Sequence, residues 1–216
     1  MRIGTWNAEG KASQRHVEFV IALQCDVWLM TEVKDELRLP GFHRCLTERY
    51  MRSDRRVHWA GVFSTFPMTP QDDPHFASAA ALIEGVPFCS TILPWAGGGA
   101  EPFGPDEGHA GKTKATLDSL RANLSAPLVW GGDWNHSLSG AEGAGSALGR
   151  RHLLDTLEVL DLHVPTADLP HHIEGLLTID HIAVPRSWTV VATNRHEAQS
   201  LGLSDHDCYV IEVQPA

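Results

Sequence analysis

The stretch Leu128-Val129-Trp130-Gly131-Gly132-Asp133-Trp134-Asn135 joins an apolar run to an acidic and an amide side chain. Leu128 to Trp130 reads as a buried β-strand. Asp133 and Asn135 then lie at the end of that strand, where an α/β scaffold presents ligands and catalytic groups. A lone Asp in such a place is most simply a cap or a surface group, and only recurrence of the pattern favours a functional interpretation.

The pattern does recur, at four other places where an apolar run meets a polar signature. Three signatures follow a strand-like run and the last precedes one: Thr5-Trp6-Asn7 after Arg2 to Trp6, Thr31-Glu32-Val33-Lys34 after Asp26 to Met30, Ile179-Asp180-His181 after Leu176 to Ile179, and Ser204-Asp205-His206 before Cys208 to Val213. An unpaired buried carboxylate is costly, so a structural core would avoid these residues. Five such signatures in one chain predict a polar site built from strand ends.

The five signatures together resemble the endonuclease/exonuclease/phosphatase superfamily. These are metal-dependent phosphoesterases that include exonuclease III, deoxyribonuclease I, neutral sphingomyelinases and inositol polyphosphate 5-phosphatases. The resemblance extends from Ile3 to Val213, and Gly132 to Asn135 and Ser204 to His206 are its most specific pieces. Thr5 to Gly10 and Glu32 to Lys34 look most like the exonuclease III and apurinic endonuclease branch. The resemblance implies an α/β layered sandwich of two packed mixed β-sheets flanked by helices, in a single catalytic domain over residues 1–216.

The resemblance also implies a metal site of oxygen ligands. Glu32 matches the main ligand, Asn7 and Asp205 assist it, and Glu9 matches a position that ligates occasionally. Carboxylates and amide oxygens are the ligands that Mg²⁺ prefers, and Mn²⁺ shares this preference. We therefore expect a Mg²⁺ cofactor for which Mn²⁺ substitutes.

The catalytic residues implied by the same resemblance are His206, Asp180, Asp133 and Asn135. Asp180 would orient the His206 ring, as a carboxylate does in a hydrolytic triad. Asp133 and Asn135 would position the attacking water and contact the phosphate. Either Asp133 or the Asp180–His206 pair would take the proton of that water.

The chain departs from the family pattern at Ile92. Relatives carry a His or Tyr there that contacts the scissile phosphate, whereas this chain reads Cys89-Ser90-Thr91-Ile92-Leu93-Pro94-Trp95. Four side chains from the following segment are candidates to replace it: Trp95, His109, Lys112 and Lys114.

Composition and charge bound the remaining interpretations. The 216 residues suffice for a core without disulfides. The four cysteines form no paired-thiolate motif and are expected to be packed and reduced. The first apolar strand is expected to begin at Arg2, and no apolar run is long enough to span a membrane. These three observations predict a cytoplasmic protein. The 13 histidines include no zinc-binding spacing, and the adjacent His171 and His172 are expected to point to different sides.

A net charge of -10 argues against a wide nucleic-acid-binding surface, but one local cluster is basic. Its residues are Arg49, Arg52, Arg55 and Arg56, around Tyr50. Such a cluster either tracks a phosphate backbone or is a solvated loop. The family resemblance favours substrate contact, and Trp95 is added to this substrate-binding set.

Helices and strands alternate along the chain. We expect helices over 13–24, 113–124 and 146–160, the last with Leu153, Leu154, Leu157 and Leu160 facing inward, and a surface loop over 97–111. Strands are expected over 57–65, 77–83, 86–93, 176–184, 189–194 and 208–213, with a hairpin turn at Glu84-Gly85.

The function predicted from the sequence is a Mg²⁺-dependent phosphodiesterase acting on DNA or another nucleic acid. The first alternative is a phosphatase or phosphodiesterase for a small or lipid phosphoester, and the second is a non-catalytic binding module. The arginine cluster favours nucleic acid and the net acidity favours a small substrate. Nothing in the sequence indicates an obligate protein partner.

Overall fold

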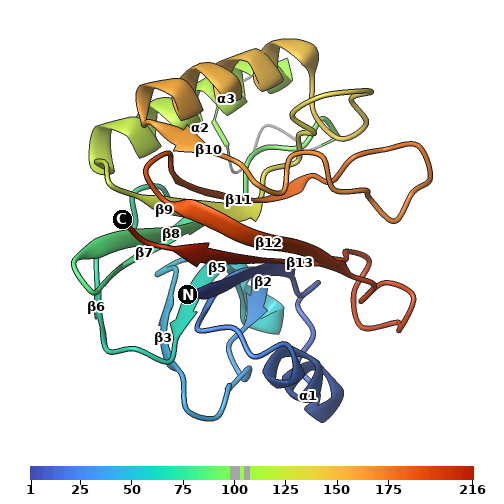
Figure 1. The fold of residues 1–216 in the computed structure, drawn as a ribbon. Helices are drawn as coiled ribbons and strands as arrows, with labels where there is room; N and C mark the ends of the chain where they lie inside the picture. Colours follow the sequence, from blue (N-terminus) through green and yellow to red (C-terminus); the bar gives the residue numbers. More distant parts are fainter. Residues whose placement is uncertain (98–102, 105–107) are drawn as a thin grey trace.

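The protein is a four-layer sandwich in which two β-sheets pack face to face and helices cover both outer faces (Figure 1). A computed structural model describes residues 1–97, 103–104 and 108–216. The first sheet contains β1 (Arg2–Asn7), β2 (Val27–Lys34), β3 (His43–Leu46), β4 (Tyr50–Arg52), β5 (Val57–Ser64), β12 (Thr189–His196) and β13 (Cys208–Gln214). The second contains β6 (Met68–Pro70), β7 (Ser78–Ile83), β8 (Val86–Thr91), β9 (Val129–Asp133), β10 (Leu162–His163) and β11 (Asp180–Pro185).

Both sheets are mixed. The first has the order β12-β13-β1-β2-β5-β3, with β4 also paired to β5, and the second has the order β10-β11-β9-β8-β7-β6. The pairs β1–β2 and β8–β9 are parallel, while their neighbours pair antiparallel. The predicted α/β sandwich of two packed mixed sheets is therefore confirmed, as is the hairpin between β7 and β8.

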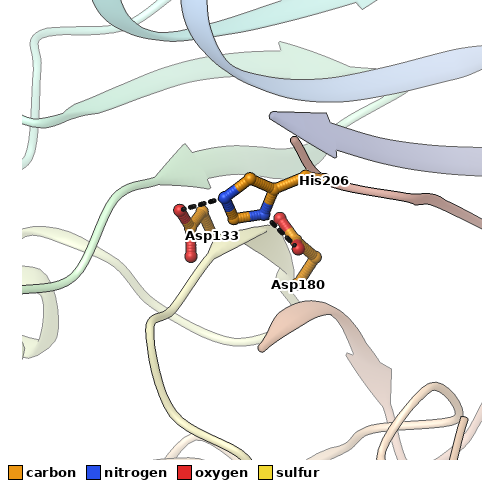
Figure 2. Close-up of side chains that lie close together, drawn as sticks. All are labelled: Asp133, Asp180 and His206. Atoms are coloured by element: carbon orange, nitrogen blue, oxygen red, sulfur yellow. Dashed lines mark hydrogen bonds and ion pairs between the residues drawn. The ribbon is translucent and has the colours of Figure 1, made fainter. Parts of the chain in front are cut away.

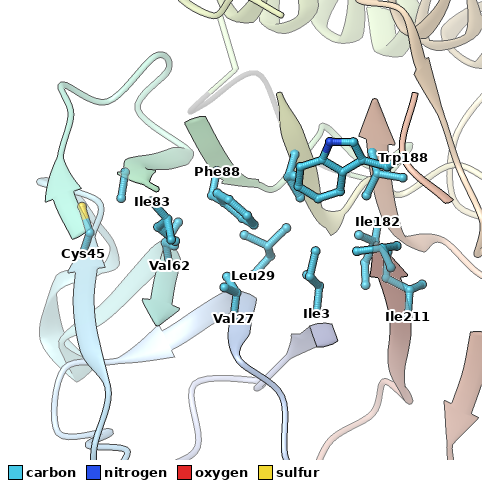
Figure 3. Close-up of a cluster of buried hydrophobic side chains, with 14 residues drawn as sticks. Ile3, Val27, Leu29, Cys45, Val62, Ile83, Phe88, Ile182, Trp188 and Ile211 are labelled. Atoms are coloured by element: carbon cyan, nitrogen blue, oxygen red, sulfur yellow. The ribbon is translucent and has the colours of Figure 1, made fainter. Parts of the chain in front are cut away.

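The core between the sheets follows from the alternation of side chains along each strand. In β2, Val27 and Leu29 point into the space between the sheets, where they meet Phe88 and Ile182 of the second sheet (Figure 3). The intervening Trp28 and Met30 lie in a different buried cluster on the other face. A strand buried on both faces reads as a continuous apolar run, which is why the sequence marked β2 clearly.

The helices bury the outer faces. Helix α1 (Gln14–Ala22), with Ser13 at its N-cap, packs Val20 against the outer face of the first sheet. Helices α2 (Gly108–Asn123) and α3 (Ala147–Val159) cover the second sheet with Leu117, Leu120, Leu153 and Leu157. A short 3₁₀ turn, η1 (Ser53–Arg55), follows β4.

Two sequence expectations about these helices were wrong. Leu154 is 43% exposed, because it lies about 100° around the helix from Leu153, which takes the inward position. Gly108 to Gly111 belongs to α2 and not to a loop. The expected loop otherwise falls partly on residues 98–102 and 105–107, which lie outside the described residues.

The four cysteines are free and buried, as expected. None of the helices in the described part of the chain is long and apolar enough to cross a membrane.

Candidate active site

The site forms where strand ends from both sheets meet at one edge of the sandwich. Asn7 is the last residue of β1, and Glu32 lies on the neighbouring parallel β2. On the second sheet, Asp133 ends β9 and is paired directly with Asp180, the first residue of β11. His206 lies in the turn that enters β13. The topology thus assembles residues that are far apart in the sequence.

The centre of the site is His206, which lies between two carboxylates (Figure 2). Its Nδ1 is 2.8 Å from Asp180 Oδ2, and its Nε2 is 3.8 Å from Asp133 Oδ2. Asp205 Oδ1 is 4.0 Å from the same Nε2, but the Asp205 side chain is mostly exposed. The ring nitrogen Nδ1 donates to Asp180, so Nε2 is directed toward Asp133.

Burial and neighbouring charges shift the pKa values of Asp133 and His206. Asp133 is 4% exposed and Asp180 is 1% exposed. Burial, opposed by His206 and reinforced by Asp180, raises the pKa of Asp133 to about 7. Burial alone would lower the pKa of His206, but the carboxylates of Asp180 and Asp133 outweigh it and raise that pKa well above its usual value. The site therefore retains protons near neutral pH.

The backbone of His206 is fixed by residues for which the sequence predicted no separate role. Ser204 Oγ donates to the carbonyl of Asn7 at 2.7 Å and accepts from the His206 backbone N–H at 3.1 Å. The Trp6 indole N–H donates to the His206 carbonyl at 3.3 Å. Ser204 and Trp6 both belong to signatures quoted from the sequence, and this is the signal that marked them.

Asn7 connects the two sheets. Its Nδ2 donates to Asp133 Oδ2 at 3.0 Å and to Glu32 Oε1 at 3.3 Å. Its Oδ1 accepts from the Glu9 backbone N–H at 2.9 Å. Glu9 in turn bonds Lys11 at 2.7 Å and the Asp205 backbone N–H at 2.9 Å. Of the other predicted metal-site residues, Glu32 and Glu9 contact the Asn7 side chain directly, and Asp205 is linked to it through Glu9.

Glu32 faces the site from a constrained backbone position. Its φ is +47°, a left-handed conformation that non-glycine residues adopt rarely. Its Oε1 meets Asn7, and its Oε2 lies 3.4 Å from Arg52 Nη2. The side chain keeps 15% of its surface exposed, so this carboxylate is accessible from solvent.

The donor set around Glu32 suits a divalent cation. Hard cations take carboxylate and amide oxygens, which Glu32, Asn7 and Asp205 carry, although Asn7 turns its Nδ2 toward Glu32 and its Oδ1 toward the Glu9 backbone N–H. Asp133, Asp180 and His206 also lie within 4.8 Å of one another. That trio suits proton transfer better than ligation, because a protonated imidazole offers no lone pair.

A hollow of about 280 Å³ opens above these groups. Its lining residues are Glu32, Met51, Arg52, Ile92, Trp95, Asp133, Asn135 and His206. We call it the catalytic hollow. Asn135 is held there by hydrogen bonds from its backbone N–H to Asp133 Oδ1 at 3.1 Å and from its Nδ2 to the Leu93 carbonyl at 3.0 Å.

Ile92 lines the catalytic hollow. An apolar side chain therefore faces the hollow at the position where the family pattern has a His or Tyr. Of the four candidate replacements, Trp95 lines the same hollow. His109 instead contacts Ser146 Oγ at 2.8 Å and the Pro94 carbonyl at 2.9 Å. Lys112 is buried in α2, and Lys114 forms an exposed ion pair with Asp118.

The four arginines do not form one patch. Arg52 lines the catalytic hollow, and Arg49 and Arg52 line a neighbouring hollow of about 550 Å³. Arg55 lies 3.9 Å from Asp54 with both side chains exposed, and Arg56 pairs with Asp35. Arg55 and Arg56 line neither of these two hollows.

A third hollow, of about 340 Å³, lies beyond His206. It is lined largely by apolar side chains from the segment before Asp180, including Ile173, Leu176 and Leu177. His171 and His172 also line it, with ring centroids 4.1 Å apart. The expectation that these two histidines point to different sides was wrong, because neither lies in a strand, where neighbouring side chains alternate.

Known proteins share this sequence pattern and fold. Residues 4–206 match the model of the Endonuclease/Exonuclease/phosphatase family. A search of curated proteins finds no match. The fold is similar to that of an AP endonuclease from Archaeoglobus fulgidus, with a TM-score of 0.72, 16% identity and 100% of each chain covered.

Two further solved structures are similar. One is a 3′ phosphatase from Neisseria bound to a product DNA hairpin, with a TM-score of 0.66, 17% identity and 100% of each chain covered. The other is the endonuclease domain of TRAS1, a telomere-specific non-LTR retrotransposon, with a TM-score of 0.68, 17% identity, and 99% of this chain and 98% of that chain covered. At these identities the structures establish the fold, while the family model establishes descent. The chain belongs to the endonuclease/exonuclease/phosphatase family of phosphoester hydrolases.

Proposed function

We propose that this protein is a divalent-metal-dependent phosphodiesterase that uses Mg²⁺ or Mn²⁺ and hydrolyses nucleic acid. The observation that carries the proposal is that Glu32, Asp133 and His206 line one hollow. Asp180 bonds His206, and Asn7 bonds both Asp133 and Glu32. The similar structures include an AP endonuclease and a 3′ phosphatase bound to product DNA, which supports nucleic acid as the substrate class.

Glu32 would hold the cation, with Asn7 and Asp205 as further oxygen donors and Glu9 next to them. A divalent ion bound there polarises a phosphoryl oxygen and offsets the charge that develops in the transition state. The protein's part is to keep Glu32 oriented, which the hydrogen bond from Asn7 and the contact with Arg52 achieve. Arg52 also lines the catalytic hollow, where it would contact a substrate phosphate.

His206 and Asp133 would divide the proton chemistry. With Nδ1 committed to Asp180, Nε2 of His206 is the nitrogen available to the hollow. The raised pKa of His206 keeps Nε2 protonated, so it donates to a phosphoryl or leaving oxygen. Asp133 then accepts the proton of the attacking water, and a pKa of about 7 suits a general base at neutral pH.

Asn135 would orient the attacking water and substrate beside Asp133. Its φ of +53° and its two hydrogen bonds fix the amide beside Asp133. The amide oxygen is left to accept a hydrogen bond from the attacking water. Such fixed groups contribute because they hold reacting atoms in position before the reaction.

A second substrate class is favoured by a separate observation. The third hollow beyond His206 is lined by Ile173, Leu176 and Leu177, which suits an apolar leaving group. A small or lipid phosphoester would place such a group there. Arg49 and Arg52 do not line this third hollow, so neither would contact the apolar leaving group.

A substrate panel tests the proposal. DNA, RNA, nucleotides, an aryl phosphodiester and a lipid phosphoester are assayed with Mg²⁺, Mn²⁺ and chelator. Hydrolysis of nucleic acid should require the ion, and Glu32→Gln should weaken ion binding measured by calorimetry. Glu18→Gln, at an exposed carboxylate on α1, is the matched control. Full activity in chelator, or unchanged ion affinity in Glu32→Gln, would contradict the metal assignment.

A further inference from the structure

A larger hollow adjoins the catalytic hollow and has a distinct composition. It measures about 550 Å³, within the range of roughly 300–1,000 Å³ of ligand pockets. It is lined by four aromatic and two cationic side chains together with Met51: Tyr50, Trp59, Phe76, Trp95, Arg49 and Arg52. We call it the aromatic hollow.

The rings of the aromatic hollow hold one another in place. Trp59 is buried and meets Phe76 edge-on, with centroids 5.4 Å apart and planes at 77°. Phe103 contacts Trp59 at 5.6 Å and Trp95 at 5.9 Å, also edge-on. Ile92 packs in the same cluster. The Tyr50 ring lies against His58, with centroids 4.4 Å apart. A ligand that stacks here therefore meets rings that neighbouring rings already contact, which lowers the entropy cost of binding.

The aromatic hollow is continuous with the catalytic hollow. Met51, Arg52 and Trp95 line both. Arg52 also reaches to within 3.4 Å of Glu32, the proposed metal ligand. When a phosphate is bound in the catalytic hollow, the part of the substrate attached to that phosphate would consequently extend toward Trp95 and Tyr50.

Charge and shape together specify the occupant. Aromatic rings interleaved with arginines suit an unpaired nucleotide, because the base stacks on a ring while the phosphates pair with guanidinium groups. A base inside a duplex is already stacked on its neighbours and presents only its edge. An acyl chain would fill the apolar wall but leave Arg49 and Arg52 without a partner from the ligand.

We propose that the aromatic hollow receives the unpaired base of a nucleotide adjacent to the scissile phosphate. The preferred substrate is then a nucleic acid with a single-stranded or frayed segment at the cleavage point. This inference rests on the proposed function for the placement of the scissile phosphate, but the binding of the base needs no turnover. Tyr50, which is 39% exposed, is a specificity-determining residue in this arrangement.

Binding is measured in chelator so that nothing is cleaved. The ligands are a labelled eight-nucleotide single strand, the same strand with a base-free tetrahydrofuran nucleotide at each position in turn, and a blunt duplex of equal length. Stacking of one base contributes enough that base removal at one position should weaken binding about 5- to 150-fold. The duplex should bind less tightly than the single strand.

Variants of Tyr50 test whether the affinity lost on base removal arises from stacking in the aromatic hollow. Tyr50→Ala should weaken the intact strand about 5- to 20-fold and leave the affinity of the sensitive base-free strand nearly unchanged, because the stacking partner is already absent from it. Tyr50→Phe keeps the ring and should restore binding. Leu148→Ala, at an exposed position on α3, is the control for an unrelated surface change.

The outcomes separate this inference from the proposed function. Base-free strands that all bind like the intact strand would overturn the inference, as would a duplex that binds equally well. Tight binding of lysophospholipid micelles that is lost in Tyr50→Ala would overturn it as well. Base-dependent binding without hydrolysis of any nucleic acid would overturn the proposed function and leave the stacking site supported.

Discussion

Replacement of Asp180 by Asn tests whether the carboxylate orients His206. Asp180 Oδ2 accepts from His206 Nδ1 at 2.8 Å, and its Oδ1 has no hydrogen-bond partner among the described residues. In the Asp180→Asn variant, either the new amide oxygen keeps the contact and buries an unpaired NH₂, or the NH₂ faces Nδ1, which must then be unprotonated. Both arrangements destabilise the imidazolium form of His206, whose Nε2 proton is the one proposed to be donated.

The size of the effect follows from the contact that is lost. A hydrogen bond between charged groups contributes about 1.5–3 kcal/mol, and each 1.36 kcal/mol of barrier is a factor of ten in rate. Loss of the imidazolium, which is a far better proton donor than the neutral ring, adds to this loss, so we expect kcat to fall by about 100-fold or more. The fold should persist, because His206 retains Asp133 at 3.8 Å and Asp205 at 4.0 Å.

Steady-state kinetics and histidine NMR titration measure the outcome. The pKa of His206 should fall in Asp180→Asn, because one of the carboxylates that raise it is gone. Asp180→Asn combined with His206→Ala should cost little more than His206→Ala alone, since residues that act as a unit are not additive. If the losses in kcat of the two single variants multiply in the double variant, or if the pKa of His206 is unchanged in Asp180→Asn, the orienting role would be refuted.

Three further predictions concern binding and stability. Arg52→Ala should reduce the slope of log affinity for single-stranded DNA against log salt by about 0.7, and Arg55→Ala by less, in a fluorescence titration across a salt series; equal effects would contradict the placement of Arg52 at the hollows. Burial lowers the pKa of His75 to about 4 from an unfolded value near 6.5, so its contribution to stability is complete above pH 6.5 and is lost as pH falls toward 4. The free energy of unfolding, measured in urea at a series of pH values, should therefore rise with pH less steeply in His75→Gln, by about 1.4 kcal/mol per pH unit between pH 4 and 6.5. The same pH dependence in wild type and variant would contradict this prediction. Gly132→Ala should cost about 2–3 kcal/mol or more in thermal unfolding, because φ is +124° and a Cβ would collide with the Thr91 backbone, and a stability equal to wild type would contradict that clash.

The sequence allowed the fold and the position of the site to be predicted because both leave local marks. A strand buried on both faces, such as β2, reads as a continuous apolar run that ends in Glu32. The polar residues after such runs are unfavourable for stability alone, so Asp133 and Asp180 stood out. Family resemblance then supplied roles that local pattern does not carry.

Other features depend on contacts between distant segments and left no local mark. The bond from Asn7 to Asp133 joins residues 126 positions apart. The aromatic hollow draws Tyr50, Trp59 and Trp95 from separate segments that share no periodicity. The Gly- and Pro-rich composition of residues 97–111 suggested a loop, but residues 108–111 begin α2, which buries Leu117 and Leu120 against the second sheet.

The hydrogen bonds at the site also connect the two halves of the sandwich mechanically. Asn7 to Asp133 links β1 with β9, and His206 to Asp180 links the entry of β13 with β11, so each bond crosses from one sheet to the other. A small slide of one sheet over the other would break both at once. The site thus cross-links the two sheets at one edge of the molecule. Ligands that stabilise these two hydrogen bonds should slow amide hydrogen exchange at the ends of all four strands together.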